Sequence, residues 1–296
     1  MLIPTVFLAA CFAGQAKIEP PHDQNPVFAK VLRDGLEDGG QMIKLPPPRL
    51  VDGQGGDAQR AAMKELAGSD RALVELLRDS VTAPFIIKVH DVKTTGATVR
   101  QADIWFAVHG DLKYIDLAKE AARTDQKAVE VANMWFQTRL LKTDELRASG
   151  VTPAQTGTDK NTWYAHIHAK LLDRIEFEVT NHVVASESSE SVVIASATDP
   201  SFANAKSLSN GWKTLTSPGG AQPDVGPQQS YLGGISYAKI SRIAFQPAAL
   251  FVEMHVAFVE PEGWFQGAPI LRSKFSVAAQ DQIRTLRREL AKKRSK

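Results

Sequence analysis

The spacing of apolar residues changes along the chain, and this change constrains the fold more than any other feature. Around Pro84 the repeat switches from three or four positions to two, as in Phe85, Ile87 and Val89. A period of two places alternate side chains on opposite faces of a strand. One apolar and one polar face are typical of an antiparallel sheet that is covered on one side.

Seven segments carry this alternation. The Thr-Gly-Ala sequence at 95–97 predicts the turn between the first two of them. The expected strands are 85–90, 103–109, 165–170, 175–180, 192–197, 235–245 and 250–259. In the last of these, the residues of one face are Leu250, Val252, Met254, Val256 and Phe258.

Helical spacing predicts the remaining regular structure. Short helices are expected at 27–36, 57–67 and 70–79, and the composition of 115–147 also indicates a helix. A C-terminal helix is expected to begin at Ser276, with a buried stripe of Ala279, Ile283, Leu286 and Leu290. The predicted fold class is α+β, with a mostly antiparallel sheet of about six to eight strands and helices on one face.

The chain divides into three parts. Residues 1–16 resemble an export signal, 17–56 form a Pro/Gly-rich tether, and 57–296 form one α+β domain. Within the domain, 199–234 is poor in aliphatic residues and predicts a long loop, to which Trp212 and Tyr231 contribute large aromatic side chains.

The N-terminal residues indicate a destination in the cell envelope. Residues 2–13 are apolar apart from Thr5, and within them Leu8-Ala9-Ala10-Cys11 resembles the bacterial lipobox. The resemblance implies lipidation of Cys11, which is the only cysteine, and attachment to a membrane through the lipid. Two alternatives stay open. Cleavage after Ala16 gives a soluble periplasmic or secreted protein. If residues 2–13 are instead a buried element of the folded domain, the protein has neither a lipid anchor nor an export signal here.

Composition excludes several classes of protein. A single cysteine allows no intramolecular disulfide framework. The formal net charge of +2 argues against nucleic acid as a partner. The sequence contains no HExxH zinc helix and no phosphate-binding loop.

Two histidine-containing pairs are the best candidates for chemistry. His166 and His168 lie two apart on one expected strand, and Glu253 and His255 lie two apart on another. Residues two apart on a strand share a face. If the two strands are neighbours, the four side chains converge and form a zinc site of a hydrolase. The alternative is that they are ordinary polar residues on a half-exposed sheet.

Three tryptophans are candidates for the walls of a ligand pocket. Trp105, Trp163 and Trp264 lie near the edges of expected elements, where aromatic side chains often cover a pocket. Core packing is the alternative explanation.

The order of the last elements resembles the helix-grip arrangement of the START-like lipid-binding superfamily. This resemblance covers residues 163–290, in which strands are followed by a long C-terminal helix. It implies binding of an apolar ligand or a protein partner without catalysis and without a cofactor. A zinc-dependent envelope hydrolase and a purely structural envelope protein are the alternatives.

Overall fold

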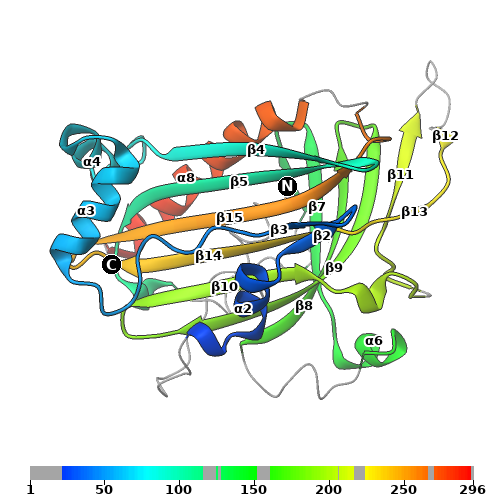
Figure 1. The fold of residues 1–296 in the computed structure, drawn as a ribbon, viewed down its shortest axis with the longest axis horizontal. Coiled ribbons are helices and arrows are strands. Elements are labelled where there is room, and N and C mark those ends of the chain that lie inside the picture. The colour runs from blue at the N-terminus through cyan, green and yellow to red at the C-terminus, as the bar shows by residue number, and fades with distance from the viewer. Residues whose placement is uncertain are drawn as a thin grey trace.

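A large, strongly twisted β-sheet forms the body of the protein, and a long C-terminal helix lies across one of its faces (Figure 1). The computed structural model describes residues 22–115, 125, 128–151, 161–205, 207–216, 224–265 and 270–294. Within these residues the sheet has twelve strands, and neighbouring strands run antiparallel. The α+β class is therefore confirmed, and the sheet is larger than the six to eight strands expected.

Nine strands follow one another across the sheet, and three shorter strands extend it beside β9. In spatial order the nine are β4 (Ile86–Thr94), β5 (Ala97–His109), β15 (Ala249–Pro261), β14 (Gly234–Arg242), β10 (Ser191–Thr198), β9 (Ile175–Glu187), β8 (Thr162–Leu171), β7 (Met134–Leu140) and β6 (Ala128–Val131). The three short strands are β11 (Gly211–Thr216), β12 (Asp224–Val225) and β13 (Gln229–Ser230). All seven strands expected from alternation are present.

Helix α8 (Ile270–Arg294) covers the inner face of the sheet. Its Phe275 packs on Phe258 of β15 with ring centroids 5.6 Å apart. The expected start at Ser276 is wrong, because the buried stripe continues towards the N-terminus through Phe275 and Leu271, and Ser276 is an exposed residue inside the helix. No helix in the described part of the chain has the length and apolar character to cross a membrane.

Arg287 fastens α8 to the sheet. Its guanidinium donates to the backbone carbonyl oxygens of Ala107 (3.0 Å), Pro84 (3.1 Å) and Ala83. The pairing of β4 with β5 ends at Ile86 and Trp105, so these carbonyls lie just beyond the last pair. Arg287 thus links the segment before β4 to β5 at the point where the pairing of these two strands ends.

The outer face is also covered, contrary to the expectation of helices on one face only. Helix α2 (Pro26–Arg33) packs against β10, and α3 (Gly56–Ala67) and α4 (Asp70–Leu76) cover one end of β5 and β15. Figure 1 shows α2 and α8 on opposite sides of the sheet. Ser69 caps α4 by accepting from Ala72 N, as its sequence predicts.

Residues 44–52, here called the N-terminal strap, cross the outer face between α2 and α3 (Figure 1). They follow the hairpin β2 (Leu36–Asp38) and β3 (Gln41–Ile43). Leu45 and Leu50 of the strap are buried. The described part of the segment that we expected to be a tether therefore packs on the domain.

The prediction of a helix within 115–147 is wrong for most of the residues of this segment that the structure describes. Strands β6 and β7 form a hairpin there, and only the short helix α6 (Thr143–Ala148) is helical. Ala132 and Asn133 make the turn with φ of 52° and 61°. Met134 and Phe136 of β7 are buried and alternate with more exposed residues, which is the period of a strand.

The segment 199–234, expected to be a loop, contributes strands to the sheet. Strand β11 pairs with β9 from Ile175 to Glu178, and β10 pairs with β9 only from Asn181 onward. The segment therefore completes the sheet where β10 stops. Trp212 and Tyr231 are both buried and hold it against the body.

Candidate functional site

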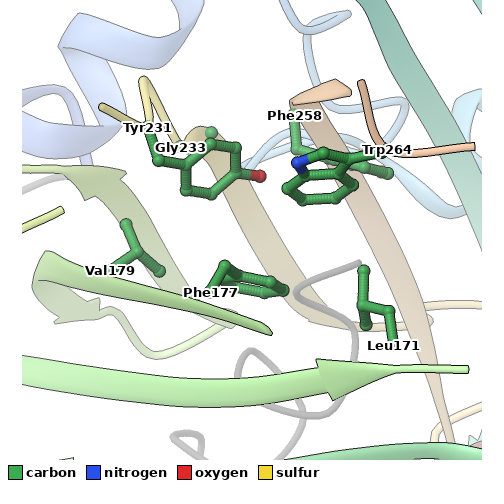
Figure 2. Close-up of a pocket in the computed structure, with 8 residues that line it drawn as sticks. Leu171, Phe177, Val179, Tyr231, Gly233, Phe258 and Trp264 are labelled. Carbon is green, nitrogen blue, oxygen red and sulfur yellow. The ribbon is translucent and has the colours of Figure 1, made fainter. Parts of the chain in front are cut away.

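An apolar cavity lies at one end of the inner face, beneath the turn that follows β15 (Figure 2). Its volume is about 10 Å³, which is room for one water molecule. Strands β8, β9, β14 and β15, the segment before β14 and the turn all contribute to it. The lining residues are Leu171, Phe177, Val179, Tyr231, Gly233, Gly234, Phe258 and Trp264.

Three aromatic rings face one another across this cavity (Figure 2). Trp264 stacks on Phe177 with centroids 5.6 Å apart and planes 20° apart. Tyr231 lies 5.3 Å from each of them. Trp212 of β11 meets the edge of Trp264 at 6.1 Å. Such offset and edge contacts are favourable for aromatic pairs, so the rings form a continuous apolar wall.

Two glycines allow the backbone to approach the cavity closely. Gly233 has φ of +74°, and a Cβ there would lie 1.9 Å from the Thr198 hydroxyl oxygen. A Cβ on Gly234 would lie 2.5 Å from the carbonyl oxygen of Ala257. The Gly-Gly pair therefore lets the chain pass from the aromatic cluster into β14.

One side-chain donor in the described lining of the cavity has no partner. Tyr231 donates its hydroxyl to the carbonyl oxygen of Val259 at 3.1 Å, and burial raises the pKa of this phenol. The Nε1 of Trp264 is buried and has no hydrogen-bond partner among the described residues. A buried indole N–H normally finds an acceptor, and leaving it unpaired costs about 1–3 kcal/mol.

An ionic cluster lies beside the cavity, in which Arg100 and Glu260 are buried and Asp91 is exposed. Arg100 faces the same side of the sheet as Phe258, its partner on the neighbouring strand. Its guanidinium contacts Glu260 at 2.6 and 3.0 Å and Asp91 at 2.7 Å. The hydrogen bonds to Glu260 raise the pKa of Arg100, although burial opposes the shift. This guanidinium is therefore already paired with two carboxylates.

Glu253 and His255 lie on the outer face, away from the cavity. Glu253 accepts the backbone N–H groups of Arg49 (2.8 Å) and Leu50 (3.0 Å) of the strap and the Trp105 indole N–H (3.2 Å). His255 pairs through Nδ1 with Asp103 at 2.7 Å. Burial raises the pKa of Glu253 in spite of its hydrogen bonds to the strap.

His166 and His168 lie on β8 and do not meet the other pair. Three strands, β9, β10 and β14, separate β8 from β15, which at about 4.8 Å per strand is roughly 19 Å. His166 bonds Thr180 at 2.9 Å and His168 bonds Glu176 at 2.6 Å. The condition for the expected zinc site is therefore not met. No group of three or more potential ligands in the described part of the chain could hold a metal.

The three candidate tryptophans occupy separate environments. Trp264 lines the cavity. Trp105 lies on the outer face beside Glu253, and Trp163 is half-buried on β8 and is not one of the lining residues. Cys11 lies outside the described residues. Phe177 was missed as a site residue, because on its own strand it is one member of an ordinary apolar alternation.

Neither a family model nor a curated protein sequence matches the chain. Among solved structures there is a likeness to the human StarD13 (DLC2) lipid transfer and protein localization domain, with 10% sequence identity and a TM-score of 0.38. The alignment covers 71% of this chain and 86% of that chain. The superposition is too loose to support a conclusion about function, so the site is interpreted from its own geometry.

Proposed function

We propose that this protein binds an apolar ligand, without catalysis, in this cavity on the inner face of the sheet, beside α8. The observation that carries the proposal is the cavity itself: its walls are aromatic and aliphatic, and its lining includes no charged side chain. Ligand sites are concave and mostly apolar, with a few polar groups that fix orientation. The unpaired indole N–H of Trp264 is such a polar group.

The cavity as it stands is the closed form of this site. Room for one water molecule does not admit an apolar ligand, so side chains must move when a ligand binds. Trp264 is the side chain best placed to do so, because it belongs to the turn 262–265 rather than to a strand. The turn closes with a hydrogen bond from Trp264 N to Pro261 O at 3.0 Å. The unpaired indole N–H of Trp264 disfavours the closed form relative to a form in which the indole donates to an acceptor.

The proposal includes export to the cell envelope, with Cys11 as a lipid anchor or with cleavage after Ala16. Only the sequence pattern of residues 1–16 supports this part. A protein partner in the envelope and a structural role are the remaining alternatives. Native mass spectrometry of the protein, isolated from a bacterial host with its own N-terminus, tests both parts together. A denatured mass beginning at Cys11 with acyl chains establishes the anchor, and a native excess of lipid size establishes a bound ligand.

A fluorescent hydrocarbon gives the sharper test of binding. Diphenylhexatriene should bind saturably at one site, with energy transfer from tryptophan. Trp264→Ala should speed its uptake because the ring that closes the cavity is gone, and Trp264→Leu serves if the alanine variant does not fold. Trp135→Phe, a half-buried position on the outer face of β7, is the matched control and should leave uptake unchanged. Absence of saturable binding, or equal uptake by the Trp264 variants and the wild type, would refute the proposal.

A further inference from the structure

We infer that the ligand carries a neutral hydrogen-bond acceptor, such as a ketone, ester or ether oxygen, on an otherwise apolar body, and that Trp264 Nε1 donates to it. This inference rests on the proposed function and adds the chemical class of the ligand. It follows from which polar groups around the cavity are already bonded and which are not.

The lining has two side-chain hydrogen-bond donors, Tyr231 and Trp264. The Tyr231 hydroxyl donates to Val259 O, and the backbone N–H of Gly234 donates to the Thr198 hydroxyl at 2.9 Å. Trp264 Nε1 is the lining side-chain donor that lacks an acceptor among the described residues. Figure 2 shows this nitrogen on the ring edge that is turned towards Tyr231. An acceptor brought by a ligand would therefore complete the pairing of the side-chain donors in the lining.

The charges beside the cavity disfavour an anionic ligand. Arg100 is the cation next to Phe258, and it is saturated by Glu260 and Asp91. Lys93 of β4 is exposed on the same face and donates to the Thr98 hydroxyl at 2.8 Å, so two cations and two carboxylates balance in this cluster. A carboxylate or phosphate headgroup would have to displace a carboxylate from Arg100 and would lose its hydration on burial. A neutral acceptor avoids both costs.

A single water molecule is the competing acceptor for the indole N–H. The cavity has room for one, but a buried water normally needs two to four polar partners. Besides the indole, the lining offers one polar side chain, the Tyr231 hydroxyl, whose proton is already donated to Val259 O. A water here has at most these two side-chain partners, the low end of what a buried water needs, and a ligand that supplies both the acceptor and apolar surface displaces it favourably.

Three naphthalene compounds of matched shape test the inference on the full chain. Naphthalene has no acceptor, 2-acetylnaphthalene has a neutral carbonyl, and 2-naphthoate has a carboxylate. Each competes with diphenylhexatriene for the wild-type protein and for Trp264→Phe, which keeps an apolar ring and removes the N–H. We expect the ketone to bind the wild type about fivefold more tightly than naphthalene, the usual net effect of one hydrogen bond. The carboxylate should bind most weakly.

The variant separates this inference from the proposed function. Trp264→Phe should bind naphthalene and the ketone equally, and Trp135→Phe should keep the fivefold preference. The indole ¹H–¹⁵N signal that is missing in Trp264→Phe should shift downfield when the ketone binds the wild type. If naphthalene binds but the ketone shows no advantage, or if the carboxylate binds best, the inference is wrong and the binding function stands. If none of the compounds binds, the proposed function fails.

Discussion

Replacing Arg287 with methionine tests whether this one side chain holds α8 on the sheet. Methionine keeps the unbranched stem and removes the guanidinium. Burial lowers the pKa of Arg287 to about 10, so the group is still charged at neutral pH. The substitution therefore removes a buried cation together with its hydrogen bonds to Ala107, Ala83 and Pro84.

The expected loss of stability follows from the three close carbonyls that lose their donor, because the fourth acceptor, Val81 O, lies 3.4 Å away and is weakly bonded. Each buried acceptor left unpaired costs roughly 1–3 kcal/mol. A cavity of about 210 Å³ borders Arg287, Ala83 and Pro84, so water can reach part of this region. The removed desolvation cost of the guanidinium offsets a further part. We therefore expect Arg287→Met to lower the free energy of unfolding by about 3 kcal/mol, which is the lower end of the summed cost of the three close carbonyls.

Urea unfolding followed by circular dichroism measures this loss, and hydrogen exchange of the α8 amides locates it. Arg288→Met is the matched control, because Arg288 is exposed on the same helix turn. A surface change of this kind usually stays within about 0.5 kcal/mol. Faster uptake of diphenylhexatriene by Arg287→Met should accompany the loss. Equal stability of the two variants would show that α8 is held by its apolar stripe alone.

Three further outcomes can be checked on single variants. Burial, together with the nearby charges of Arg139 and His168, lowers the pKa of His166 to about 4. The contribution of the neutral imidazole to the free energy of unfolding is therefore fully present above pH 6.5 and is lost as the pH falls towards 4, by at most about 3 kcal/mol. His166→Gln should flatten this part of a stability–pH curve. Glu253→Gln turns an amide group towards one backbone N–H of the strap, so it should cost about 1–3 kcal/mol and speed hydrogen exchange of the strap amides. Gly233→Ala should lower the thermal midpoint by several degrees, since its φ of +74° and the contact with a neighbouring threonine both exclude a Cβ.

The strands could be predicted because their local pattern survives in the sheet. Ile175, Phe177 and Val179 alternate with polar neighbours in the sequence, and all three are buried on the inner face. The β6–β7 hairpin was not predicted, because its turn residues, Ala132 and Asn133, are not a strong turn signal, although Asn tolerates positive φ. Apolar residues spaced for a strand were therefore assigned to a helix.

The cavity could be predicted only in part, because its walls come from distant segments. Trp264 was proposed from its place near the edge of an expected element, and it does line the cavity. Its contacts with Phe177 and Tyr231 depend on β9 exchanging β10 for β11 as its partner. That exchange is set by strand pairing between residues 33 to 39 positions apart, which no local window of sequence contains.

The polar residues of the outer face were interpreted as metal ligands for a related reason. A helix that covers a sheet has its N–H groups bonded internally, so it needs an apolar surface beneath it. The N-terminal strap is extended and makes no such internal bonds, and its backbone groups need partners from the sheet. Glu253 supplies two acceptors, Tyr237 donates to Pro46 O at 2.6 Å, and Lys239 pairs with Asp52 at 2.9 Å. A carboxylate and a lysine within a buried strand therefore indicate an extended covering segment here, and the covering segment lies some two hundred residues away in the sequence.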